Sequence, residues 1–261
     1  MHWLIAAAVV LATLVLVGCG KSSTKSAVAS TTTASKLTGS LTVFAAASLT
    51  EAFNDEKAAL ATAHRELRLT NSFAGTSSLV TQIQQGAPAD VFASADEKNM
   101  QKLVDAGLVD VPMTFARNKL EIAVAAGNPK HITALADLAQ SDLRVVLVDP
   151  SVPAGTYSQQ ALGKAGVTVK PKSQELDVRS ALAKVTSGEA DATIVYVTDV
   201  TAAGAQAVGV DIPDADNVVA VYPIAVVKAS AHHDAAAAYV DEIVSGTGQR
   251  ALAGRGFLPP A

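Results

Sequence analysis

The chain has 261 residues, a formal net charge of −4 and 49% hydrophobic residues, with only 4% aromatic residues. This length is enough for two lobes with cores of their own, and an apolar content carried by Ala and Val suits layered α/β structure. The acidic balance and the lack of a basic stripe exclude a nucleic-acid partner.

Residues 1–18 read as a signal peptide, because residues 3–17 are almost unbroken apolar yet shorter than the ~20 residues of a spanning helix. The run ends in Leu16-Val17-Gly18-Cys19, which resembles the lipobox of bacterial lipoproteins, although no Lys or Arg precedes it. We expect Cys19 to be acylated and to become the mature N-terminus. The alternative is an ordinary secretory peptide with an incidental cysteine. Cys19 is the only cysteine, so an intrachain disulfide is excluded.

Residues 19–40 follow as a flexible tether rich in Ser, Thr, Ala and Lys. This tether carries three lysines and no acid, so the remainder of the chain has a formal charge of −7. An anion-binding protein with this balance must use local dipoles and hydrogen-bond donors rather than its overall field.

The folded part opens with a predicted strand over residues 41–44, which runs through three alanines into Ser48. Ser48 and Glu51 match a capping box, so Ser48 is the predicted N-cap of the helix that follows. A strand that feeds a helix through small residues directs unpaired N–H groups and the positive end of the helix dipole at one point, which suits an anion. The alternative is that Ser48 only caps its helix.

The same construction is repeated along the chain. A predicted strand over residues 67–73 leads through Gly75 to Thr76, Ser77 and the start of a helix. Asp96 and Asp177 are predicted N-caps, and a helix is expected to open at Pro153-Ala154-Gly155. Further strands are predicted near residues 91–93, 120–126, 145–148, 193–197 and 218–227, and the end of the chain is predicted to be helical.

Strands that alternate with helices predict two α/β lobes, each a mainly parallel sheet flanked by helices. The long extended stretches near Leu120 and Val218 are candidates for crossings between the lobes. We therefore assign residues 41–117 and 223–261 to the first lobe and residues 118–222 to the second.

Common catalytic and metal-binding motifs are missing from the sequence. There is no Gly-x-Ser-x-Gly elbow, P-loop, His-Glu-x-x-His or cysteine pair. His232 and His233 are adjacent, and adjacent side chains point apart on a helix, so a solvated helix start is preferred over a metal site.

The chain resembles the molybdate-binding proteins of bacterial ABC-type uptake systems over nearly all of residues 41–258. The matching segments are Val43-Phe44-Ala45-Ala46-Ala47-Ser48-Leu49-Thr50, Phe73-Ala74-Gly75-Thr76-Ser77-Ser78-Leu79, residues 86–96, residues 149–155, residues 177–182, residues 194–196 and residues 222–227. The resemblance implies a two-lobed type II periplasmic-binding-protein fold that clamps an oxyanion between its lobes.

The resemblance also implies the molybdate-binding residues. Ser48 would donate from its hydroxyl and N–H, and Thr76 from its hydroxyl, a role that the neighbouring Ser77 could share. The second lobe would supply the N–H groups of Ala154 and Val178 and the hydroxyl of Tyr196. All of them would bind the oxyanion, with no direct ligand to the metal. From the residues alone, Tyr196 would be interpreted as a core tyrosine.

The expected function is extracytoplasmic capture of molybdate, and also tungstate, for a membrane permease of the ABC type, by a lipid-anchored monomer without a cofactor or enzymatic activity. A site made only of donors suits an unprotonated dianion, whereas a protonated phosphate would bring a hydrogen without an acceptor. Sulfate passes this test and must be rejected by size. The alternatives are a ligand-sensing domain of the same fold and an extracytoplasmic hydrolase that uses Ser48.

Overall fold

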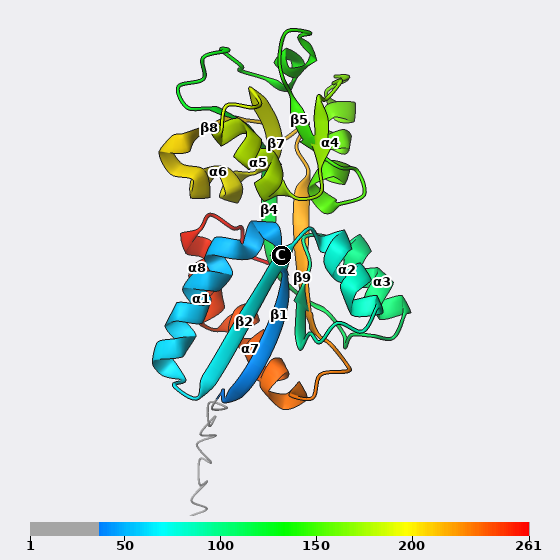
Figure 1. The fold of residues 1–261 in the computed structure, drawn as a ribbon, viewed down its shortest axis with the longest axis vertical. Coiled ribbons are helices and arrows are strands. Elements are labelled where there is room, and N and C mark those ends of the chain that lie inside the picture. The colour runs from blue at the N-terminus through cyan, green and yellow to red at the C-terminus, as the bar shows by residue number, and fades with distance from the viewer. Residues whose placement is uncertain (1–36, 261) are drawn as a thin grey trace, which may run out of the picture. The chain divides into compact units, whose positions relative to one another are not determined.

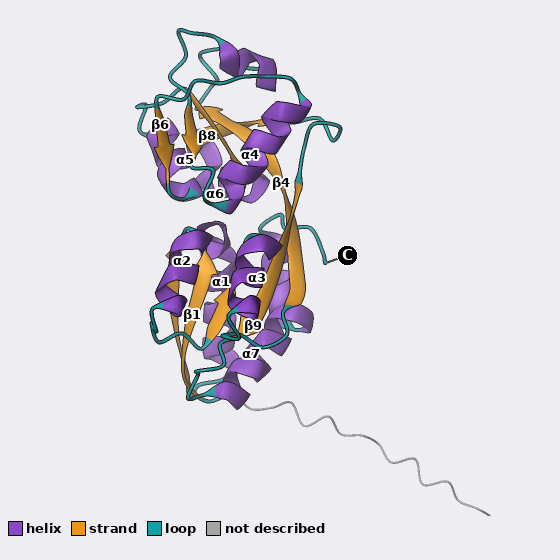
Figure 2. Ribbon diagram, turned by 90° about the vertical axis from the view of Figure 1, so that its right-hand side faces the viewer, coloured by secondary structure: helices purple, strands orange, loops and turns teal. Residues whose placement is uncertain are grey.

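The computed structural model describes residues 37–260, so the expected signal peptide and Cys19 lie outside the described residues. The described chain forms two halves, each with strands at its centre and helices outside (Figures 1 and 2). None of the helices in this part of the chain has the length and apolar character needed to cross a membrane.

The first half is a sheet with helices on both faces. Its strands and helices are β1 (Gly39–Ala46), β2 (Leu67–Ala74), β3 (Val91–Ala93), α1 (Thr50–Ala63), α2 (Thr76–Gln84), α3 (Glu97–Asp105), α7 (His233–Ser245) and α8 (Thr247–Gly254). Helices α1, α7 and α8 lie on one side and α2 and α3 on the other (Figure 1). Phe44 packs on the α2–α3 side, whereas its neighbours Val43 and Ala45 belong to the larger core, as expected when successive strand residues face opposite ways.

The second half is also α/β. Its elements are η2 (Leu135–Ala139), β5 (Val146–Val148), α4 (Pro153–Lys164), β6 (Ser173–Glu175), α5 (Val178–Thr186), β7 (Ala192–Tyr196), α6 (Val197–Ala203), η3 (Gly204–Gln206) and β8 (Ala207–Asp211). Strands β6 and β8 and helix α6 were not among the predicted elements. The N-caps predicted at Asp96 and Asp177 are confirmed, since their carboxylates accept from Asn99 N and Ser180 N at 2.9 Å.

Two strands, β4 (Met113–Ala125) and β9 (Val219–Val226), connect the halves (Figure 2). β4 pairs with β9 over residues 113–119 and with β7 and β8 from residue 120 onward. The expected crossings near Leu120 and Val218 therefore coincide with strands that the halves share. The expected lobe boundaries at residues 117 and 223 fall within these two strands.

The sheets are mixed rather than mainly parallel, which corrects the expectation. Pairs β1–β2, β1–β3 and β5–β6 are parallel, but every pair that includes β4 or β9 is antiparallel. The reason is that β4 leaves the first half and β9 returns to it, so the two run in opposite directions side by side.

The folded part begins before residue 41, contrary to the expected extent of the tether. Gly39 and Ser40 pair with Leu67 and Arg68, and Gly39 N donates to Glu66 O at 3.1 Å. Leu37 is only 2% exposed. The sequence pattern of residues 19–40 did not predict this earlier start of the fold, because Gly39 and Ser40 are small, polar residues like those of the tether.

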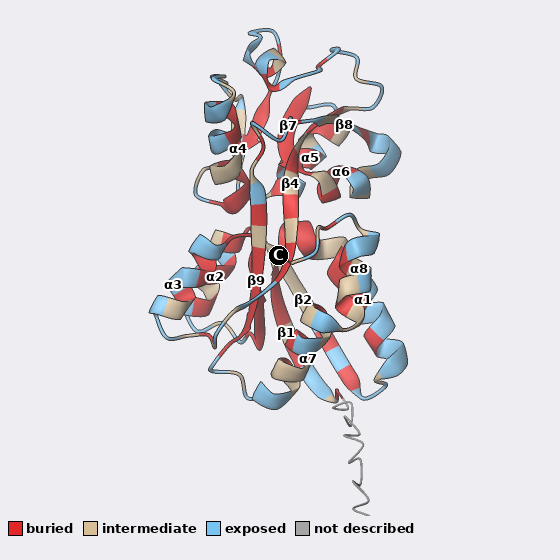
Figure 3. Ribbon diagram, turned by 180° about the vertical axis from the view of Figure 1, so that it is seen from behind, coloured by how far each residue is buried: buried red, intermediate tan, exposed pale blue. Residues whose placement is uncertain are grey.

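One hydrophobic core extends through both halves. It includes Phe53 and Phe115 of the first half, Tyr222 on β9 and Tyr196 at the end of β7. The rings of Phe115 and Tyr222 have centroids 6.2 Å apart, and those of Tyr222 and Tyr196 are 5.8 Å apart. Figure 3 shows the buried strands at the centre of each half and the exposed faces of the helices outside.

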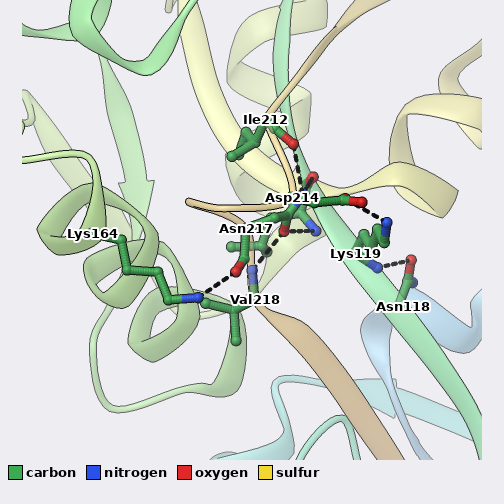
Figure 4. A network of polar contacts seen from close by, with 8 residues as sticks. Asn118, Lys119, Lys164, Ile212, Asp214, Asn217 and Val218 are labelled. Atoms are coloured by element: carbon green, nitrogen blue, oxygen red, sulfur yellow. Dashed lines mark hydrogen bonds and ion pairs between the residues drawn. The ribbon is translucent and has the colours of Figure 1, made fainter.

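The side chain of Asn217 takes the place of a strand beside β4. One edge of β4 pairs with β9 as far as Lys119 and with β8 from Glu121 onward. Leu120 lies between these two paired stretches. Asn217 Oδ1 accepts from Leu120 N at 3.0 Å, and Asn217 Nδ2 donates to Leu120 O at 2.9 Å (Figure 4). The carboxamide thus replaces the peptide group that a neighbouring strand would supply.

We expect Asn217→Ala to lower the free energy of unfolding by about 1–3 kcal/mol, because Leu120 is buried and loses both hydrogen bonds. Urea unfolding followed by circular dichroism measures the change. Lys119→Ala is the matched control in the same network, since it removes only the exposed ion pair with Asp214 and should cost less than about 1 kcal/mol. Equal losses in the two variants would contradict this role of Asn217.

Candidate functional site

A small pocket lies between the two halves. The first half contributes β1, η1 (Ala47–Leu49), the start of α2 and the segment after β3, and the second half contributes the starts of α4 and α5 and the end of β7. The lining residues are Ala46, Ala47, Ser48, Gly75, Thr76, Ala95, Val148, Val152, Pro153, Ala154, Asp177, Val178 and Tyr196.

Five of the six residues predicted to bind an oxyanion line this pocket, namely Ser48, Thr76, Ala154, Val178 and Tyr196. Ser77 does not. Its hydroxyl donates to the Ser151 carbonyl of the other half and so connects the two halves outside the pocket. Of the two hydroxyls left open by the sequence, only that of Thr76 belongs to a pocket-lining residue.

Ser48 is not the N-cap of α1, which corrects the expectation. It lies within the 3₁₀ turn η1, and α1 begins at Thr50. Ser48 Oγ instead lies 3.0 Å from Tyr222 Oη, and Glu51, the expected capping partner, forms an ion pair with Arg179 of α5 at 2.7 Å. The extra turn moves Ser48 out of the capping position, and the pair Glu51–Arg179 joins the two halves.

Thr76 is the first residue of α2 and is 1% exposed. Its Oγ1 accepts a hydrogen bond from Ala95 N at 3.3 Å. Because a hydroxyl has one hydrogen and two lone pairs, Thr76 retains its hydrogen for a further acceptor. The side chain is therefore set up as a donor.

Helices α4 and α5 present their N-termini to the pocket. The N–H groups of Ala154 and Val178 lie in first turns, where no intrahelical acceptor exists. Gly155 allows α4 to pack closely, since a Cβ atom there would lie 2.0 Å from the Asp149 carbonyl oxygen. Both carboxylate oxygens of Asp177 are engaged by Ser180, through its N–H and its hydroxyl.

Tyr196 ends β7 with its side chain fully buried. Its hydroxyl has no hydrogen-bond partner among the described residues. Burial raises the pKa of Tyr196 well above its usual value, so the hydroxyl stays protonated and is available as a donor. A buried hydroxyl without a protein partner is costly, which points to a ligand acceptor.

Asp199 and Tyr222 support the site and were missed in the sequence. Asp199 Oδ2 accepts from Tyr196 N at 3.0 Å, and burial raises the pKa of Asp199 to about 7, so this carboxyl carries less negative charge than an ordinary aspartate. The spacing of three residues from Tyr196 is a capping pattern that could have indicated Asp199. No local pattern links Tyr222 to Ser48, because 174 residues separate them.

The pocket has donors but no cationic side chain. Among its described lining residues none is Lys, Arg or His, and Arg179, next to Val178, is paired with Glu51. Residues 37–260 also contain no group of three His, Cys, Asp or Glu side chains suited to a metal ion. Hydroxyls and helix N-termini can bind an anion without a countercharge.

The sequence matches the family described as bacterial extracellular solute-binding protein over residues 41–258. It is 40% identical over 264 aligned residues to the molybdate-binding protein ModA of Mycobacterium tuberculosis H37Rv, with complete coverage of both chains. The substrate-binding domain of a putative molybdenum ABC transporter from Clostridium difficile is 28% identical, with a TM-score of 0.64, 85% of this chain covered and 99% of that one. The periplasmic molybdate-binding protein of Azotobacter vinelandii shares the fold at 22% identity, with a TM-score of 0.75, 85% of this chain and 100% of that one covered.

We expect Gly75→Ala to weaken binding of an oxyanion such as molybdate by about tenfold or more. This factor corresponds to the free energy of one hydrogen bond to a charged group. A Cβ atom at Gly75 would lie 2.2 Å from the Leu176 carbonyl oxygen of the other half and would hold the two sides of the pocket apart. Isothermal titration calorimetry measures the affinity.

The control is Gly163→Ala on α4, where an added Cβ atom has no neighbour within 4 Å. This variant should bind as the unaltered chain does. Unchanged affinity in Gly75→Ala would show that closure at Gly75 is not needed.

Proposed function

The chain belongs to the bacterial extracellular solute-binding protein family, and we propose that it captures molybdate outside the cytoplasm and delivers it to an ABC transporter. The single observation that supports this most is a pocket between two halves that offers hydroxyls and helix N-termini together with the unpartnered hydroxyl of Tyr196. The named relatives that bind molybdate add to it.

The donor set suits an anion without protons. Ser48, Thr76 and Tyr196 can each donate a hydroxyl hydrogen, and the starts of α4 and α5 add the N–H groups of Ala154 and Val178. The one carboxylate in the lining, Asp177, is directed at Ser180, from which its two oxygens accept two hydrogen bonds. A protonated phosphate would have to find an acceptor for its hydrogen among groups that are otherwise donors, whereas molybdate would not.

Tungstate is a second ligand on the same reasoning, because it is also a tetrahedral dianion without protons. Sulfate shares this property, so its rejection has to depend on size, through contacts that are too long for a smaller anion. Ser77 and Gly75 lie at contacts between the halves and limit how far the pocket can contract.

We further propose a lipid anchor at Cys19, a monomeric state and binding without a cofactor. A protein that delivers a solute to a membrane permease gains from being held at the membrane surface by its tether. Enzymatic use of Ser48 is disfavoured, since no His lines the described pocket and the neighbour of the Ser48 hydroxyl is the phenol of Tyr222.

Calorimetry of the chain against molybdate, tungstate, sulfate and phosphate tests the proposal, and Tyr196→Phe tests the site. The variant should lose about 1.5–3 kcal/mol of molybdate binding, the worth of a hydrogen bond to a charged group. The empty protein should be no less stable, because the Tyr196 hydroxyl has no protein partner.

Tyr239→Phe is the matched control, since this tyrosine is also fully buried with an unpartnered hydroxyl but does not line the pocket. It should bind molybdate normally. Equal affinity of Tyr196→Phe and the unaltered chain would place the second-half ligand on another residue, and preference for phosphate over molybdate would refute the proposed function.

Cys19→Ala tests the lipid anchor. The variant should move from the membrane fraction to the supernatant, because a single acylated site holds the tether. Its molybdate affinity should stay unchanged, since Cys19 is 18 residues before the first described residue. Fractionation and immunoblotting measure the distribution, and a variant that stays in the membrane fraction would contradict acylation at Cys19.

A further inference from the structure

Tyr222 lies on β9, the strand through which the chain returns to the first half, and it is completely buried. Its ring packs in tilted or edge-on contacts with Phe115, Tyr196 and Phe257, with centroids 6.2, 5.8 and 5.5 Å away. Tyr222 is absent from the pocket lining, so it acts behind the residues that would touch a ligand.

The hydroxyl of Tyr222 contacts the hydroxyl of Ser48, with Oη and Oγ 3.0 Å apart and both residues buried. Either oxygen can donate in this pair, but each hydroxyl has only one hydrogen. If Ser48 gives its hydrogen to Tyr222, it can offer only a lone pair to the pocket. If Tyr222 donates to Ser48, the Ser48 hydrogen is free to point at an anion.

A bound dianion determines the direction of the hydrogen bond between Ser48 and Tyr222, because the dianion accepts hydrogen bonds and cannot donate one. Burial raises the pKa of the Tyr222 phenol, so the hydroxyl keeps its hydrogen. A phenol is also the more acidic of the two hydroxyls and therefore the better donor. The consistent chain of donation runs from Tyr222 to Ser48 and from Ser48 to the oxyanion.

We propose that Tyr222 is a positioning residue that holds the Ser48 hydroxyl as a donor to the bound oxyanion. This inference rests on the proposed capture of molybdate. With Tyr222 in place, the Ser48 oxygen accepts a hydrogen bond through one lone pair, and the Ser48 hydrogen is free to point at the anion. Without Tyr222, the Ser48 hydroxyl loses the hydrogen bond that orients it and that strengthens its own donation to the anion.

The test is a double-mutant cycle of Tyr222→Phe and Ser48→Ala, with molybdate titrated into the purified full chain. Tyr222→Phe keeps the ring contacts and should weaken molybdate about three- to tenfold. In the Ser48→Ala background, Tyr222→Phe should have no further effect on molybdate affinity.

The outcomes separate the two proposals. If the unaltered chain does not bind molybdate, the proposed function fails. If it binds molybdate but Tyr222→Phe leaves the affinity unchanged, or the effects of the two substitutions are additive, the positioning role fails. Tyr239→Phe, which removes another buried hydroxyl, should leave molybdate affinity unaltered.

A measurement on the unaltered chain covers the case in which Tyr222→Phe does not fold. The buried hydroxyl proton of Tyr222 should be protected from exchange with water and visible by NMR. Its resonance should shift downfield on addition of molybdate, because donation by Ser48 to an anion strengthens the hydrogen bond that Ser48 accepts. A resonance that molybdate does not move would overturn the proposal.

Discussion

Strands β4 and β9 pair antiparallel from Met113–Ile224 to Lys119–Val219, and this ladder connects the two halves of the described chain. The pocket draws residues from both halves, so the distance between Ser48 on one side and Tyr196 on the other depends on it. Asn217 continues the hydrogen bonding past the end of the ladder through its side chain. The same strand β9 also places Tyr222 in contact with both of these residues.

The pocket presents the partial charges of hydroxyls and helix N-termini instead of the full positive charges of Lys or Arg side chains. Small residues at the helix starts let the backbone come close to the pocket, as Gly155 shows by its packing against the Asp149 carbonyl. First-turn N–H groups and hydroxyls are held by the fold before a ligand arrives, so little reorganisation is needed on binding. Selectivity in such a site follows from the direction of each hydrogen bond, which is why the orientation of the Ser48 hydroxyl matters.

Local patterns predicted local features of the fold. The caps at Asp96 and Asp177 and the helix starts at Thr76 and Pro153 follow from residues close in sequence, and they are present. The pattern at Ser48 and Glu51 failed because contacts to Tyr222 and Arg179, more than 120 residues away, determine both side chains. The direction of β4 and β9, the strand β8 and the fully buried position of Tyr222 depend on such distant contacts and leave no periodic signal. Tyr196 was placed in the site by family resemblance alone.

The absence of a cationic side chain from the described pocket lining has a consequence for the rate of capture. With a formal charge of −7 from residue 37 onward, the protein repels a dianion at distances beyond the short reach of the helix dipoles. Dissolved ions screen this repulsion over about 10 Å at 0.1 M ionic strength, while the enclosed hydrogen bonds are hardly affected. Salt therefore accelerates association and leaves dissociation nearly constant, the reverse of what a site built on arginine or lysine would show.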